Sequence, residues 1–219
     1  VWLGDIERID GWIQVVHNEA MLQEHLNDSA GLLVLLPHMG NWELFNVFYR
    51  RYGQMTALYQ PPRQDYMQKL MQKVRLRHGN HMVPTTRSGL KQLYKTLREG
   101  GTAVILPDQV PTTGQFVPFF GHPALTDVLA SRLLKKTGAK ALGITMVRNE
   151  QGLFEAHVLA PDSSIYEPDE LTSIGAVNDL MQTCAEIAPK QYQWEYKRFR
   201  ERPAGSEKIY RFNKPSGVH

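Results

Sequence analysis

Hydrophobic positions along the chain alternate between short continuous runs and longer stretches with helical spacing. The short runs predict buried strands at residues 32–37, 55–59, 81–83, 102–106, 140–148 and 154–159, the last two able to pair as a hairpin. The longer stretches predict helices at residues 11–27, 42–52, 65–78, 88–98, 124–137 and 169–187. Residues 110–121, with three phenylalanines in six positions, are predicted as a loop that either plugs the core or lines an apolar site. The alternation predicts an α/β fold, in which helices flank one mixed, largely parallel sheet within a single domain spanning residues 1–219.

The segment after the first predicted strand carries the strongest candidate chemistry. Residues 38–43 read HMGNWE, which places an imidazole and a carboxylate five positions apart. Five residues of a regular helix turn through about 500°, so His38 and Glu43 can meet only if His38 lies on the turn before the helix. Gly40 and Asn41 are residue types that allow such a turn. We therefore predict that Glu43 orients His38 as a general base at the carboxyl end of a strand.

The sequence lacks the common motifs of nucleophilic and nucleotide-binding enzymes. It contains no G-x-S-x-G elbow, P-loop, H-E-x-x-H or G-x-G-x-x-G. A base without an internal nucleophile activates a substrate proton, for example that of a hydroxyl that then attacks directly, and no acyl-enzyme is needed. If the activated group is water, the same base makes the protein a thioesterase or ester hydrolase, and this alternative stays open.

Several charged residues follow the predicted strands. Arg63, Arg75, Arg77 and Arg87 flank the second and third strands, and Asp108 ends the fourth. In a largely parallel sheet these strand ends share one edge with His38. Arginines there would bind phosphate or steady an oxyanion, and Asp108 would be available to pair with an arginine.

Composition places the chain among globular proteins, with 42% hydrophobic and 21% charged residues. The single cysteine, Cys184, excludes an internal disulfide and is expected to be a small core residue. The histidine pairs 78/81 and 17/25 lack a third ligand, so no metal is expected.

Charge and chain ends indicate possible partners. The net charge is +3, yet residues 190–219 hold eight Lys or Arg and three Glu among many aromatics. This favours a phosphate-bearing partner or an anionic membrane surface, and a non-catalytic binder of anionic lipid or nucleic acid is the remote alternative.

No apolar run reaches the roughly 20 residues of a transmembrane helix. Because the chain begins with Val and enters patterned sequence at once, we interpret it as lacking an N-terminal portion.

Four ordered motifs, spread over about residues 10–203, resemble one known family. The HMGNWE segment is similar to the H-x4-D/E motif of glycerolipid acyltransferases, in the form found in the late (lauroyl/myristoyl) acyltransferases of lipid A biosynthesis. Three further segments agree with that family: YQPPR at 59–63, LPDQ at 106–109 followed by VPFFG at 117–121, and QYQWEYKRF at 191–199.

The resemblance implies transfer of a fatty acyl chain from acyl carrier protein to a hydroxyl of a lipid A precursor, at the cytoplasmic face of the inner membrane. No cofactor, no metal and no nucleic-acid partner are expected. His38 would be the base and Glu43 its orienting carboxylate. Arg75 would meet phosphate or the transition state, Asp108 would support the site, and Arg63, Arg77 and Asn41 are further candidates for substrate binding. Arg63 departs from the family pattern, which often has a basic pair after Pro-Pro, because Gln64 follows it here. The family also carries an N-terminal hydrophobic segment, which fits the interpretation of a missing N-terminal portion.

Overall fold

The computed structural model describes residues 4–60 and 79–210. Arg63, Arg75 and Arg77 lie outside the described residues, as does the helix predicted at residues 65–78.

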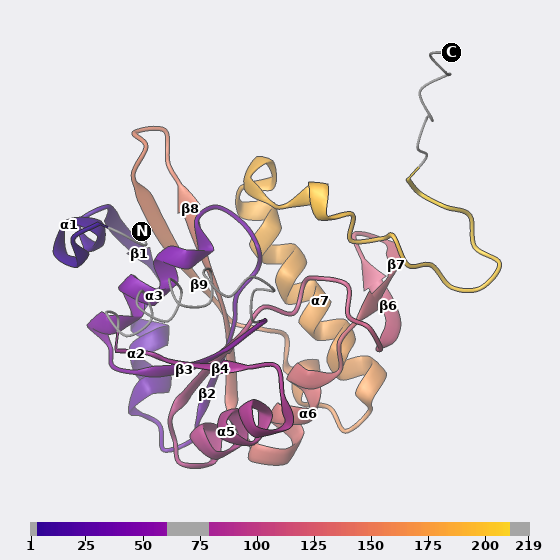
Figure 1. Cartoon of the computed structure of the whole chain (residues 1–219), viewed down its shortest axis with the longest axis horizontal. Helices are drawn as coiled ribbons and strands as arrows, with labels where there is room; N and C mark the ends of the chain where they lie inside the picture. The colour runs from indigo at the N-terminus through magenta and orange to yellow at the C-terminus, as the bar shows by residue number, and fades with distance from the viewer. Residues whose placement is uncertain (1–3, 61–78, 211–219) are drawn as a thin grey trace.

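A seven-stranded sheet forms the centre of the molecule (Figure 1). Its spatial order is β1 (Ile13–His17), β9 (Phe154–Leu159), β8 (Lys140–Arg148), β2 (Leu32–Leu35), β5 (Thr102–Ile105), β3 (Met55–Tyr59) and β4 (His81–Pro84). Neighbouring strands are parallel except for the β8–β9 hairpin. The predicted α/β class with a mixed, largely parallel sheet is confirmed.

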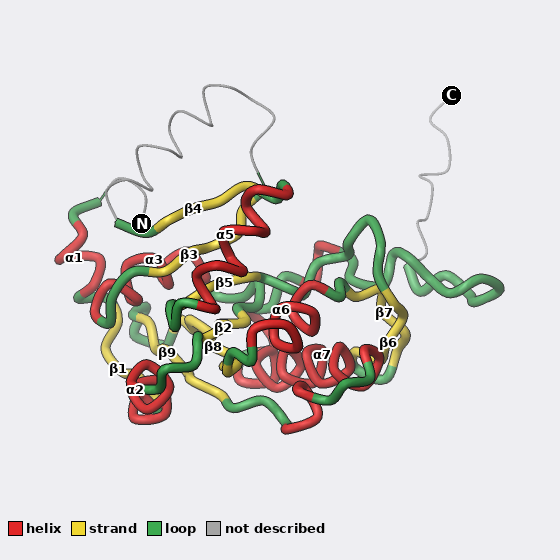
Figure 2. Tube along the Cα trace, turned by 90° about the horizontal axis from the view of Figure 1, so that it is seen from below, coloured by secondary structure: helices red, strands yellow, loops and turns green. Residues whose placement is uncertain are grey.

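Helices cover both faces of the sheet (Figures 1 and 2). One core contains residues of α1 (Ile6–Asp10), α2 (Glu19–Asn27) and α3 (Phe45–Phe48), and the other contains residues of α5 (Arg87–Arg98), α6 (Leu129–Thr137) and α7 (Glu170–Ile187). The central strand β2 serves both, since Leu32 and Val34 belong to the first core and Leu33 and Leu35 to the second. Burial on both faces is the reason that β2 is a continuous apolar run.

The helix predicted at residues 42–52 forms as three short segments. The 3-10 turn η1 (Trp42–Leu44) leads into α3, and the 3-10 turn η2 (Tyr49–Arg51) follows it. Further 3-10 turns are η3 (Ser163–Tyr166), η4 (Pro189–Gln191) and η5 (Trp194–Tyr196). The long helix predicted at 169–187 is confirmed as α7, with Asp169 as its N-cap. Cys184 is buried in its core-facing side, as expected.

The helix predicted at residues 11–27 is wrong in its first half. Residues 13–17 form the edge strand β1, which pairs in parallel with β9, and the helix begins only at Glu19. Between them Asn18 adopts a left-handed conformation with φ 59°. The helical spacing of Trp12, Val15 and Val16 was outweighed by pairing with β9, a partner more than a hundred residues away in the sequence.

The loop predicted at 110–121 and the helix start predicted at 124 are also wrong. A second sheet, the hairpin of β6 (Gln115–Phe119) and β7 (His122–Thr126), occupies this region and packs on α7. Phe120 and Gly121 form its two-residue turn with φ 46° and 72°, as a type I′ turn requires. Phenylalanine rarely occupies such a turn position, and prolines rarely lie inside strands. The residues of this segment therefore did not predict a hairpin.

The Phe-rich segment contributes one phenylalanine to the core. Phe119 is fully buried and packs against Phe120 and Phe199, whereas Phe116 is 38% exposed. Within residues 4–60 and 79–210, none of the helices is both long and apolar enough to cross a bilayer.

Candidate active site

An imidazole and a buried carboxylate meet where two central strands end. His38 follows β2 and Asp108 follows β5, its parallel neighbour. Asp108 Oδ1 lies 2.6 Å from Nδ1 of His38, and Asp108 Oδ2 accepts the backbone N–H of His38 at 2.7 Å. The carboxylate side chain is 2% exposed and the imidazole 15%. Because the carboxylate accepts the proton on Nδ1, the lone pair of the neutral ring is on Nε2, where a base needs it.

Behind Asp108 lie two residues of the last motif, Tyr192 and Arg198. Burial raises the pKa of Tyr192, and the charge of Asp108 and a hydrogen bond to it add to that shift. Burial lowers the pKa of Arg198, while the charges of Tyr192 and Asp108 partly offset this. Arg198 donates to Leu125 O and Thr126 Oγ1 and lies over the ring of Phe119. Thus two residues of the last motif interact electrostatically with the carboxylate that holds His38.

The turn that carries His38 is fastened to the last motif through the backbone. Gly40 N–H donates to Gln191 O at 2.9 Å, and Gln193 N–H donates to His38 O at 3.1 Å. Met39 forms a β-bridge with Tyr192, and Asn41 N–H donates to Met146 O on β8. Backbone hydrogen bonds therefore join the turn to a segment about 150 residues later in the chain.

Gly40 is required at this turn for two independent reasons. Its φ is +55°, and a Cβ at this position would collide with the carbonyl oxygen of Met146. We expect Gly40→Ala to lower the free energy of unfolding by more than about 2 kcal/mol, measured by urea denaturation, and to slow catalysis because His38 is displaced. Gly175→Ala is the matched control: it lies in α7 with open space around it and should be neutral or stabilising by about 0.5–1 kcal/mol. Equal stability of the two variants would contradict this account of the turn.

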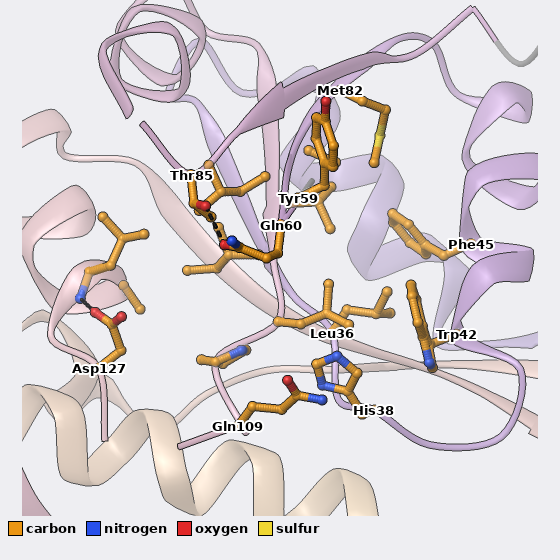
Figure 3. A pocket seen from close by; sticks show the side chains of 18 of the residues that line it. Leu36, His38, Trp42, Phe45, Tyr59, Gln60, Met82, Thr85, Gln109 and Asp127 are labelled. Carbon is orange, nitrogen blue, oxygen red and sulfur yellow. Dashed lines mark hydrogen bonds between the residues drawn. The ribbon is translucent and has the colours of Figure 1, made fainter. Parts of the chain in front are cut away.

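A pocket of about 500 Å³ opens beside His38 (Figure 3). Its size is in the range of small-ligand sites. Figure 3 shows Trp42 and Phe45 on one side of the pocket and Tyr59 and Gln60 on the other. The described lining is mainly apolar and includes Leu36, Met55, Ala57, Leu58, Met82, Val104, Ile105 and Leu106. The imidazole of His38 therefore lines a mainly apolar space.

The structure brings together three of the residues singled out in the sequence. Glu43 lines the same pocket as His38, and Asp108 lies behind the imidazole. The prediction that Glu43 orients His38 stays a prediction, because the hydrogen bond at Nδ1 is made by Asp108. Asn41 precedes η1 and is not among the described lining residues, so its role in binding also stays a prediction.

Tyr192 and Arg198 were missed as parts of the site, although their motif was noticed. The sequence gives no signal for Arg198, because Phe199 has an arginine on each side and only the fold buries Arg198 and leaves Arg200 exposed.

A carboxylate-held imidazole at the sheet edge, beside a mainly apolar pocket, is an arrangement typical of acid–base enzymes. The chain belongs to the bacterial lipid A biosynthesis acyltransferase family, whose model matches residues 1–201. The resemblance drawn from the motifs is thereby confirmed.

Characterised relatives are moderately similar in sequence. The chain is 24% identical over 212 residues to the lipid A biosynthesis palmitoleoyltransferase of Escherichia coli K12, covering 95% of this chain and 68% of that protein. It is 27% identical over 220 residues to the lauroyltransferase of the same organism, covering 95% and 69%. Among solved structures, the 1-acyl-sn-glycerophosphate acyltransferase PlsC of Thermotoga maritima aligns with a TM-score of 0.48 and 10% identity, covering 84% of this chain and 80% of that one.

Proposed function

We propose that this protein transfers a fatty acyl chain from an acyl-carrier-protein thioester to a hydroxyl of a lipid A precursor. The observation that carries the proposal is the His38–Asp108 pair beside an apolar pocket. The family and the printed names of the relatives support the acyl transfer and the acceptor. The carrier-protein donor and the location at the cytoplasmic face of the inner membrane rest on the motif resemblance.

The proposed reaction needs one base and no covalent enzyme intermediate. His38 Nε2 takes the proton of the acceptor hydroxyl as its oxygen attacks the thioester carbonyl. The tetrahedral intermediate collapses, the C–S bond breaks, and the thiolate takes the proton from the imidazolium. One ester and one thiol are formed. Asp108 keeps the ring in the productive tautomer and stabilises the imidazolium.

The other candidate residues have proposed roles in binding. The apolar wall of the pocket would hold the acyl chain, so that the thioester carbonyl lies near His38. Arg75, Arg63 and Arg77 would meet the phosphates of the acceptor or the developing oxyanion. Asn41 would contact substrate from the turn.

The direct test combines purified protein, acyl-carrier-protein thioesters of several chain lengths and a lipid A precursor, with products identified by mass spectrometry. The expected product is the precursor with one added acyl group. Parallel reactions contain coenzyme A thioesters as donors, or a lysophospholipid as acceptor. Exclusive release of free fatty acid with saturating acceptor would make the protein a hydrolase, and preferential acylation of the lysophospholipid would also overturn the proposal.

Glu43 is expected to contribute to the rate of acyl transfer by orienting the imidazole of His38. We expect Glu43→Gln to reduce the rate of transfer by about 10²-fold or more, at the lower end of what a positioned base supplies. The double variant His38→Ala/Glu43→Gln should then transfer acyl groups almost as fast as His38→Ala alone, because the effects of substitutions in residues that act as a unit do not add. The matched control is Glu150→Gln, an exposed glutamate beyond β8. A change confined to the apparent affinity for the acceptor would contradict this role.

A further inference from the structure

Three potential metal ligands cluster on the edge strands β1 and β9, outside the active-site pocket. His17 and His157 are opposite each other in the register of the two strands, and Glu155 lies two residues before His157 on the same face of β9. His17 Nε2 is 2.8 Å from Glu155 Oε2, and His157 Nε2 is 3.9 Å from the same oxygen. The ligand atoms of all three lie within 4.8 Å of one another.

These separations are close to those around a tetrahedral ion. Bonds of about 2.0–2.1 Å from a tetrahedral zinc place neighbouring ligand atoms about 3.3 Å apart. The observed 2.8 and 3.9 Å each lie about half an ångström from that value, and no two of the three ligand atoms are more than 4.8 Å apart. The imidazoles are stacked with centroids 4.2 Å apart, and rotation about χ2, a broad torsion, would tilt both lone pairs onto one ion.

We infer that His17, Glu155 and His157 form a binding site for a divalent transition-metal ion of the zinc class. Two imidazoles and one carboxylate make a donor set that suits zinc, with a fourth position for water. Magnesium and calcium require shells of oxygen ligands, which two nitrogens do not offer.

A neighbouring amide orients one of these ligands. Asn149 Nδ2 donates to Glu155 Oε1 at 3.2 Å, which orients the carboxylate and leaves Oε2 facing the histidines. Side-chain exposures of 43%, 28% and 20% give an ion access from solvent.

The position of the site indicates what a bound ion would do. β1 is an edge strand paired only with β9 among the described strands, and its pairing is irregular between Ile13 and Val15. An ion held by His17 from β1 and by two ligands from β9 would fasten this edge strand to the sheet. The role is structural and independent of acyl transfer.

The test titrates chelator-treated full-length protein with zinc chloride near neutral pH, using isothermal titration calorimetry, and repeats the titration with magnesium chloride. Wild type is expected to bind one zinc per chain and no magnesium at this site. His17→Ala, Glu155→Gln and His157→Ala should each weaken zinc binding at least about 100-fold, and Asn149→Ala about 10-fold. His81→Ala, at an exposed position of the edge strand β4, and His38→Ala, in the candidate active site, should bind zinc as wild type does.

Thermal melts provide a second measurement that is also independent of activity. Zinc at about 100 times its Kd should raise the Tm of wild type by roughly 5 °C, because the ion binds only the folded chain. The three ligand variants should melt cooperatively without zinc and show no such increase. Zinc affinity unchanged in His157→Ala, or lost in His38→Ala but kept in the ligand variants, would overturn the inference.

Discussion

Replacing His38 with alanine is expected to reduce acyl transfer by about 10²–10⁴-fold, the contribution of a positioned general base. The acceptor hydroxyl would then have no group to take its proton as it attacks the thioester. The loss should appear in kcat, since the apolar lining that would bind the acyl chain remains intact. Initial rates from mass-spectrometric quantification of the acylated product provide the measurement.

The control for this variant is His81→Ala, which removes an exposed imidazole from β4 and should retain the wild-type rate. Circular dichroism and urea denaturation would verify that both variants fold. A folded His38→Ala protein with full activity would remove the central claim of the mechanism.

The second large effect is expected from Asp108→Asn. One carboxylate oxygen accepts the backbone N–H of His38, so the amide oxygen of asparagine must take that place. The amide NH₂ group then faces Nδ1, which must accept a hydrogen bond instead of donating one. The ring proton moves to Nε2, and the base is lost although the shape of the site is preserved. We expect a fall of about 10³–10⁴-fold in kcat, as for other histidines held in the wrong tautomer.

Asp162→Asn is the matched substitution outside the site, because the amide oxygen can still accept the N–H of Ser164. It should be neutral in rate. If folded Asp108→Asn works within a few-fold of wild type while Glu43→Gln is severely impaired, then Glu43 alone orients His38. The reverse result would assign that role to Asp108.

Much of the sheet was predictable because its strands are locally encoded. The bounds predicted for β3, β8 and β9 agree with the structure, since β3 and β8 are largely apolar runs and β9 alternates buried apolar residues with less buried ones. The errors are at β1 and at the β6–β7 hairpin, where long-range partners decide the conformation. The spacing in β1 resembles a helix until β9 pairs with it, and Phe120 tolerates its left-handed conformation where Gln182 accepts its N–H and α7 supports the hairpin.

The sequence by itself determined the chemical class of the protein: a turn bearing His38 after a buried strand, Glu43 close behind it, and motifs that assign the chain to its family. Only the tertiary structure decided which carboxylate holds the imidazole. Asp108 is 70 residues from His38, and the two meet because β2 and β5 are parallel neighbours that end at the same edge. Strand order is set by the packing of the whole sheet between its two helical layers, and no local pattern of residues encodes it. For the same reason Tyr192 and Arg198, at the far end of the chain, could be assigned to this site only after folding placed them behind Asp108.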